Sequence, residues 1–185
     1  MAHEPKPRVE VMQVINREVR QMSVFELVIV FAAFLCSLVA GFLFAFAAVV
    51  MPGIKSFDDK QFIKTFQLTD RVIQNNQPLF LLVWVGSAVS IIFFAISGFA
   101  KLQGVDFALL ILATVGYLIG VQVSTIVIHL PLNNKLQQYD VDTMSEAEIH
   151  AARIAFESRW NRSNVIRTIA ACCASFLLIV LALRQ

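Results

Sequence analysis

Residues Pro131 to Arg167 read PLNNKLQQYDVDTMSEAEIHAARIAFESRWNRSNVIR, and the rest of the chain is organised around them. This stretch is the longest polar segment of a 185-residue chain that is 58% hydrophobic and only 15% charged. Soluble domains carry about 25% charged residues, so this composition indicates a membrane protein. No Gly or Pro follows Pro131, and Ser145 and Glu148 have the spacing of a capping box. These features predict a single helix from about Ser145 to Leu183.

Long apolar runs lie on both sides of this segment, and a bilayer is spanned by about 20 apolar residues. The runs are Leu27–Met51 (25 residues), Leu79–Ala100 (22), Phe107–Ile128 (22) and, with Arg167 near its start, Val165–Leu183 (19). We therefore predict an all-α fold, an integral membrane four-helix bundle. The fourth helix is expected to be long and to extend out of the membrane.

The chain divides into an N-terminal arm, residues 1–23, and one four-span membrane domain, residues 24–185. The predicted spans cover about 24–51, 79–100, 107–130 and 165–183. In the arm, Val9–Met22 has the pattern of an amphipathic helix. Pro52 and Gly53 are expected to end the first span, and Ser56–Gln74 has the pattern of an interfacial helix.

Ser23 and Glu26 precede the first span with the spacing of a capping box. Glu26 is therefore interpreted as a cap, with a functional intramembrane acid as the alternative. Two stripes of small residues predict close helix packing, and they are also expected to support a homo-oligomer. The stripes are Ala33, Ser37, Gly41 and Ala45 in the first span, and Gly116, Gly120 and Ser124 in the third.

Polar residues converge where the long connections meet the bundle. Gln122, Thr125 and His129 share one face of the third span, and Asn133 and Asn134 follow it. Such residues often form only interhelical hydrogen bonds, worth about 0.6 kcal/mol each. The alternative is that they form the wall of a polar pocket.

The last helix brings a second set of polar and aromatic side chains to the same end of the bundle. Trp160, Asn164 and Arg167 recur at helical spacing and lie on one face. Arg167 is a cation at the edge of a span, where charge is costly unless it is paired.

Metal and thiol chemistry find little support in the sequence. The three Cys form no C-x-x-C pair, and three His do not suffice for a haem or a closed zinc site. Glu146, His150, Arg153 and Glu157 line one helix face and are interpreted as salt-bridge partners rather than metal ligands. No metal or cofactor is expected, and no basic cluster indicates a nucleic-acid partner.

Three motifs together resemble the anthrone-oxygenase-like integral membrane family. They are GFLFAFAAVVMPGI (Gly41–Ile54), LPLNNKL (Leu130–Leu136) and FESRWNRSNVIRT (Phe156–Thr168). The resemblance covers roughly residues 27–183 and implies four membrane helices. For fungal relatives it implies cofactor-independent oxidation of anthrones to anthraquinones by dioxygen. The family pattern has a second aromatic residue and a His around Asn164, where this chain has Ser163 and Val165.

Two hypotheses follow for function. In the first, the chain is a membrane enzyme for a lipophilic aromatic or quinone-like substrate, with His129 as the base and Arg167 as the oxyanion partner. Gln122, Asn133, Asn134, Trp160 and Asn164 would then bind the substrate. In the second, the chain is a non-catalytic membrane protein, and the same residues tie the long connection to the last helix. An open polar cleft favours the first hypothesis, and mutual hydrogen bonding favours the second.

The expected partners are the lipid bilayer, a lipophilic small molecule and a second copy of the chain. An even number of spans places both termini on the same side of the membrane. The two long connections carry nine Lys and Arg, against six on the side of the termini. This excess favours a cytoplasmic position for the long connections, in the inner membrane of a bacterium.

Overall fold

Four long helices form the bundle in the computed structural model, which describes residues 23–185. Each is long and apolar enough to cross a membrane: Val24–Ile54, Pro78–Phe99, Gly104–Gln137 and Glu146–Leu183. Residues 23–185 contain no β-strand, which confirms the predicted all-α class. The expected amphipathic helix Val9–Met22 lies outside the described residues.

The outside of the long helices is covered by large apolar side chains. Examples that are more than half exposed are Phe31, Phe93, Leu112 and Phe176. Soluble monomers rarely expose contiguous apolar surface on this scale. This surface fits a lipid environment and agrees with the prediction of an integral membrane protein.

The first long helix consists of α2 (Val24–Ala45), the π-helical turn η1 (Phe46–Val50) and α3 (Met51–Ile54). Ser23 and Glu26 form the predicted capping box. The expectation that Pro52 and Gly53 end the helix is wrong, because the helix continues to Ile54. Pro52 lies in the first turn of α3, directly after the wider π-helical turn, where a missing N–H is tolerated.

Helix α4 (Asp59–Gln74) fills the first long connection and packs on the bundle. Its cap is Asp58, whose side chain accepts from the Gln61 N–H, and not the expected Ser56. The helix is held by Gln67, whose Nε2 donates to the carbonyl oxygens of Leu136 (2.8 Å) and Tyr139 (2.9 Å).

Helix α5 (Pro78–Phe99) and the third long helix form an antiparallel hairpin. The third helix contains α6 (Gly104–Tyr117), π-helical turns η2 (Leu118–Val123) and η3 (Thr125–His129), and α7 (Leu130–Gln137). It continues through Pro131, which lies in the first turn of α7. As at Pro52, a wider turn precedes the proline. Such turns often occur at functional sites.

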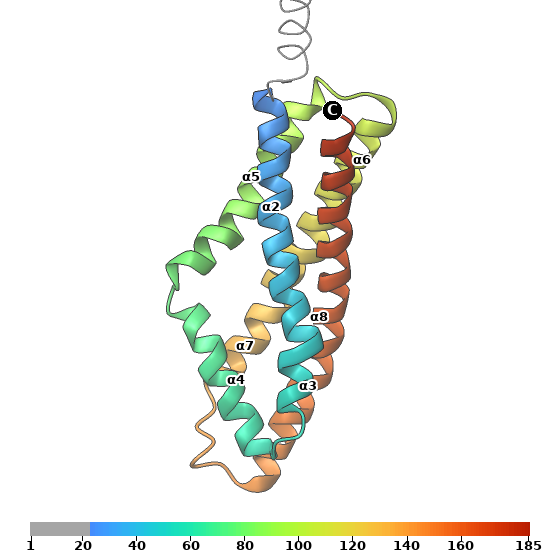
Figure 1. The fold of residues 1–185 in the computed structure, drawn as a ribbon. Coiled ribbons are helices and arrows are strands. Elements are labelled where there is room, and N and C mark those ends of the chain that lie inside the picture. The colour runs from blue at the N-terminus through green and yellow to red at the C-terminus, as the bar shows by residue number, and fades with distance from the viewer. Residues whose placement is uncertain (1–22) are drawn as a thin grey trace, which may run out of the picture.

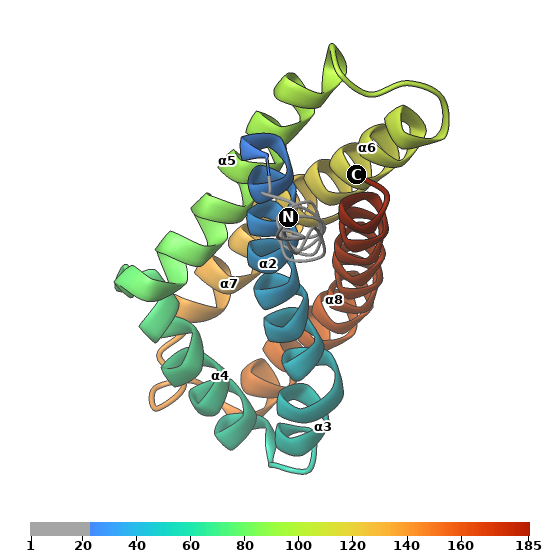
Figure 2. The ribbon, with the colours of Figure 1, turned by 45° about the horizontal axis from the view of Figure 1, so that its top comes forward.

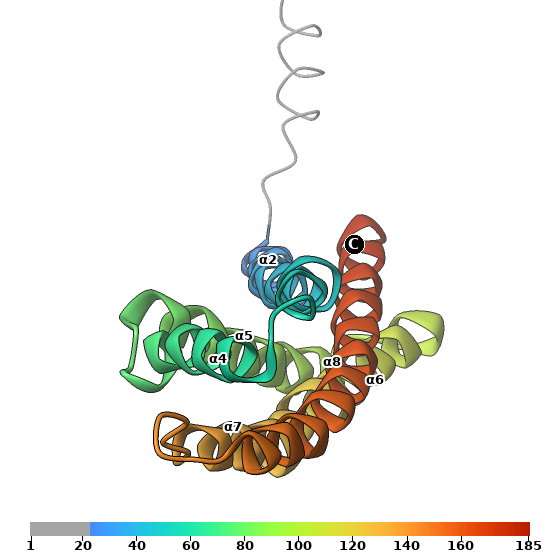
Figure 3. The same ribbon diagram turned by 90° about the horizontal axis from the view of Figure 1, so that it is seen from below.

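Helix α8 (Glu146–Leu183) is a single 38-residue helix that begins with the predicted Ser145–Glu148 capping box. Its second half packs along α2 and α6, and its first half packs against α4 and α7. The start of α2, the α5–α6 turn and the C-terminus lie at one end of the molecule, and α3, α4 and α7 lie at the other (Figures 1 and 2). Seen from that second end, α7 runs beside the first half of α8 (Figure 3).

Two packed cores follow from this arrangement. The membrane core joins α2, α5, α6 and α8 through residues such as Ile29, Phe94 and Leu178. The loop-end core joins α3, α4, α7 and the first half of α8 through Phe62, Phe66 and Trp160, among others. The polar residues singled out from the sequence lie where the two cores meet.

Candidate functional site

An aromatic pocket of about 400 Å³ opens at the junction of the two cores. This volume is within the range of about 300–1,000 Å³ that is usual for small-molecule sites. Its aromatic walls come from five different elements and consist of Phe42, Phe46, Phe66, Phe80, Trp84 and Trp160. The rings contact one another, for example the stacked Phe80 and Trp84 at 5.4 Å. The pocket therefore suits a flat, apolar ligand.

Arg167 supplies a cation to the pocket wall while being only 5% exposed. Its Nε donates to Asn164 Oδ1 (2.9 Å), and its Nη1 donates to Thr125 Oγ1 (3.2 Å). The guanidinium lies over the Trp160 ring, 5.5 Å from the centroid. No carboxylate among residues 23–185 pairs with it, and its Nη2 donates no hydrogen bond there. A buried cation of this kind favours an anionic or strongly polar oxygen of a ligand.

His129 is the second polar group in the wall and is 2% exposed. It belongs to the wide turn η3, which directs it toward α8. Its Nε2 lies 3.0 Å from Ser163 Oγ, and its ring meets the Trp160 ring edge-on at 5.1 Å. Its Nδ1 has no hydrogen-bond partner in the described part of the chain. If Nε2 carries the proton and donates to Ser163, Nδ1 is left as a free acceptor.

A chain of hydrogen bonds crosses the far side of the pocket. Trp160 Nε1 donates to Asn133 Oδ1 (2.9 Å), and Asn133 Nδ2 donates to Asp70 Oδ1 (2.7 Å). Asp70 is 4% exposed and also accepts from Gln137 Nε2 (3.0 Å) and Gln74 Nε2 (2.6 Å). A buried carboxylate held by amides alone needs this full set of donors. The network connects Trp160 of α8 to Asn133 of α7 and Asp70 of α4, and it thereby fixes the position of the Trp160 ring.

The mouth of the pocket lies on the lipid-facing surface. Leu81, Ile126 and Leu130 line the pocket and are 37%, 61% and 45% exposed. Leu81 belongs to α5, Ile126 to η3 and Leu130 to α7. A lipophilic ligand could therefore enter from the bilayer without crossing water.

The structure brings together most of the residues that the sequence singled out. Gln122, Asn133 and Trp160 line the pocket with His129 and Arg167. The Gln122 Nε2 atom is buried without a hydrogen-bond partner in the described residues.

Two of the singled-out residues do not line the pocket. Asn164 is buried behind Arg167, and its Nδ2 donates to the Leu43 carbonyl oxygen (3.3 Å), so it positions the guanidinium. Asn134 is exposed on the outer face of α7.

Sequence reasoning missed Asp70 and Phe66 on α4, and four further aromatic residues of the wall on the first long helix and α5. A signal for Asp70 was present, since Phe62, Phe66 and Asp70 recur every four residues on the buried face of α4. The four further aromatics form two i, i+4 pairs, Phe42 with Phe46 and Phe80 with Trp84. Within single helices such pairs look like ordinary core residues.

Metal ligands do not gather at this site. Residues 23–185 contain no group of three or more His, Cys, Asp or Glu placed to hold a metal ion. The expected salt-bridge face of α8 is confirmed for three of its four residues, because Arg153 pairs with Glu157 (2.8 Å) and His150 with Asp59 (2.7 Å), whereas Glu146 forms no ion pair among residues 23–185.

Comparison with known proteins gives one match. A profile of the anthrone oxygenase family matches residues 70–178, more than half of the chain. The chain therefore belongs to this family, which confirms the resemblance inferred from its motifs. Neither the curated proteins nor the solved structures that were searched gave a match.

Proposed function

We propose that this member of the anthrone oxygenase family is a membrane enzyme that oxidises a lipophilic, anthrone-like phenol with dioxygen. The observation that carries the proposal is that Arg167 and His129 both line one aromatic pocket. Arg167 is a buried cation without a carboxylate partner among residues 23–185, and the buried Nδ1 of His129 has no hydrogen-bond partner there. Family membership and the mouth of the pocket on the lipid-facing surface agree with such a substrate.

The proposed chemistry assigns one role to each group. His129 Nδ1 removes a proton from the acidic methylene carbon, and Arg167 stabilises the negative charge that develops on the ring oxygen. The carbanion reduces dioxygen by one electron, the two radicals combine, and protonated His129 returns its proton, which gives a hydroperoxide at that carbon. Loss of the second proton from this carbon with cleavage of the O–O bond releases one water and leaves the quinone. One dioxygen is thus consumed per quinone and water formed.

Ser163 lies where the chain departs from the family pattern, and it contacts His129. In the proposed mechanism, its hydroxyl oxygen accepts from Nε2 and keeps Nδ1 available as the base. The residue that differs from the family pattern therefore lies beside the proposed base, and we expect this difference to affect which phenol is the substrate.

The proposal is tested by oxygen uptake of purified protein with a panel of anthrone-like phenols. Uptake should match quinone formation one to one and fall at least about 100-fold in His129→Ala, as expected for loss of a general base. His150→Ala is the matched control, because His150 is exposed and pairs with Asp59 outside the pocket. Unchanged uptake in His129→Ala, with His150→Ala also unchanged, would eliminate His129 as the base.

The second candidate function is a non-catalytic membrane protein, and a specific observation favours it. Asp70, Asn133 and Trp160 satisfy one another and tie α4, α7 and α8 together. In this case the parent protein consumes no oxygen with any phenol of the panel. Asn133→Ala would then lower the thermal unfolding temperature without any other measurable effect.

A further inference from the structure

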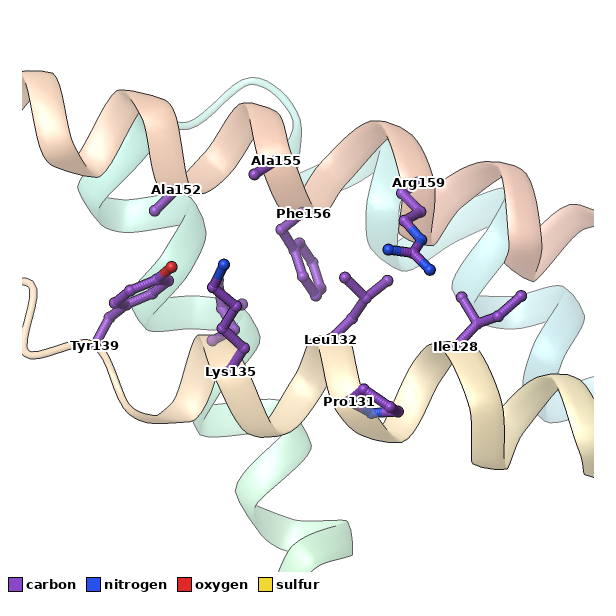
Figure 4. Close-up of a pocket in the computed structure, with 10 residues that line it drawn as sticks. Ile128, Pro131, Leu132, Lys135, Tyr139, Ala152, Ala155, Phe156 and Arg159 are labelled. Atoms are coloured by element: carbon purple, nitrogen blue, oxygen red, sulfur yellow. The ribbon is translucent and has the colours of Figure 1, made fainter.

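A second pocket lies between α7 and α8 and shares no lining residue with the aromatic pocket. Its volume is about 300 Å³. In Figure 4, Lys135 reaches from α7 toward α8, and Arg159 reaches from α8 toward α7. Leu132 and Phe156 lie between the two cations and form an apolar floor. We call this pocket the α7–α8 groove.

The groove lies at the level where the apolar spans end. On α8, Arg162 is the last charged residue before the segment that begins at Val165, apart from the inward-facing Arg167. On the third helix, Ile128 ends the uncharged run, and Lys135 is the first charged residue after it. One end of the groove therefore faces acyl chains and the other faces the headgroup layer.

The two cations of the groove lack acidic partners. Lys135 and Arg159 are exposed, and neither forms an ion pair or side-chain hydrogen bond within residues 23–185. Two nearby acids are already engaged, since Glu157 binds Arg153 and Asp142 binds Lys60 and Lys64, while Asp140 accepts from the Asp142 N–H and pairs with neither groove cation. The lining of the groove contains no Asp or Glu. Its charge is thus complementary to an anionic headgroup and not to the cationic choline group.

We infer that the α7–α8 groove binds an anionic phospholipid, with the headgroup phosphate between Lys135 and Arg159. The first acyl carbons leave the groove along Pro131 and Ile128, toward the apolar spans. Basic pockets between membrane helices bind anionic lipid headgroups by this combination of charge and apolar contact. The lipid would bridge α7 and α8 without occupying the aromatic pocket, so this inference does not depend on the proposed function.

Native mass spectrometry of the full chain in detergent tests the inference. With equimolar phosphatidylglycerol and phosphatidylcholine, the parent protein should retain phosphatidylglycerol about tenfold more, as two surface cations allow. The double variant Lys135→Gln/Arg159→Gln should bind both lipids equally. The matched control is Arg162→Gln, because Arg162 is exposed on the next turn of α8 but does not line the groove.

Three outcomes would overturn the inference. The first is equal retention of the two lipids by the parent protein, and the second is loss of preference in Arg162→Gln to the same extent as in the double variant. The third is competition by millimolar inorganic phosphate, which would indicate a site for a free anion. If the double variant does not fold, Lys135→Arg/Arg159→Lys replaces it. That exchange keeps both charges, and the preference should persist.

Discussion

Helix α8 carries two largely buried arginines 14 residues apart, and their surroundings differ sharply. Arg153 lies in the loop-end core with its side chain 12% exposed. Its Nε donates to Glu157 (2.8 Å), and its Nη1 donates to Asp59 (3.0 Å) and to the Phe57 carbonyl oxygen (2.8 Å). Its Nη2 donates to the Lys55 carbonyl oxygen (2.8 Å). Every nitrogen of this guanidinium has a partner, and two carboxylates balance its charge.

Arg167 is buried more deeply but has fewer partners. It uses two nitrogens, toward Asn164 and Thr125, and pairs with no carboxylate among residues 23–185. Desolvating a charge without a counter-ion is costly, so stability alone does not explain this arrangement. Arg153, with every nitrogen bonded, joins α8 to α4 and to the loop before it, whereas Arg167 has an unused nitrogen beside the aromatic pocket, which is why we propose that it binds a ligand oxygen.

The largest expected difference between the two arginines is in catalysis. Arg167→Gln should lower the oxygen-uptake rate about 100- to 1,000-fold, as expected when a donor to a developing oxyanion is lost. Arg153→Gln should change the rate by no more than about threefold at a temperature where the variant stays folded. The reason is that Arg153 forms hydrogen bonds only with groups outside the aromatic pocket. Initial rates per folded protein measure both. Equal losses in the two variants would remove the distinction.

Stability should show the reverse order. Arg153→Met leaves Glu157 without its cation and Asp59 with His150 as its remaining partner, and it should cost about 3 kcal/mol of unfolding free energy. Arg167→Met removes an unpaired buried charge from an apolar site and should cost less than about 1 kcal/mol, or stabilise the protein. Denaturant unfolding in detergent compares the two variants. A larger loss in Arg167→Met would indicate that Arg167 is mainly structural.

The sequence predicted one member of this pair better than the other. Trp160, Asn164 and Arg167 share a helix face because α8 contains no Gly or Pro, and helical periodicity alone places them together. Whether Arg167 has an acidic partner depends on which helices approach it, and a single sequence does not contain that information. Arg153 was interpreted correctly as a salt-bridge residue because Glu157 is four residues away on the same helix.

The fold was predictable for a similar reason. Apolar length identifies spans, and local capping boxes mark the starts of α2 and α8. The continuation of helices through Pro52 and Pro131 was harder to anticipate, since it depends on the wider turns before them. Asp70 was missed because its amide partners Asn133 and Gln137 lie more than 60 residues away in the chain.

A third prediction concerns the spacing that lets Arg167 reach Thr125. A Cβ added at Gly120 would lie 2.5 Å from the Cβ of Ala170 on α8, whereas one added at Gly116 would meet nothing within 4 Å. Gly120→Ala should therefore push η2 away from α8, cost about 1–2 kcal/mol of stability and weaken the Arg167–Thr125 contact. Gly116→Ala is the matched control and should be neutral or slightly stabilising. Thermal unfolding of both variants, with their uptake rates, tests this.

The smallest effect is expected at the exposed end of the loop-end core, where carboxylates are paired as they are around Arg153. Hydrogen bonds from Lys60 and Lys64 lower the pKa of Asp142 from 3.8 to about 2. Because the folded-state pKa is depressed, the ionised carboxylate stabilises the fold fully above about pH 4, and this stabilisation is lost as the pH falls toward 2.

The test of this last prediction is the pH dependence of thermal unfolding for the parent protein and Asp142→Asn. The parent should lose more of its unfolding temperature between pH 4 and pH 2 than the variant, and added salt should reduce the difference because the ion pairs are exposed. A residual slope is expected in the variant, since bonding to His150 and then Arg153 also lowers the pKa of Asp59. Identical slopes in the two proteins would mean that Asp142 does not contribute. Arg167 pairs with no carboxylate in residues 23–185, so its contacts contain no group that acid would protonate. Acid should therefore weaken the ion pairs around Arg153 before it affects Arg167.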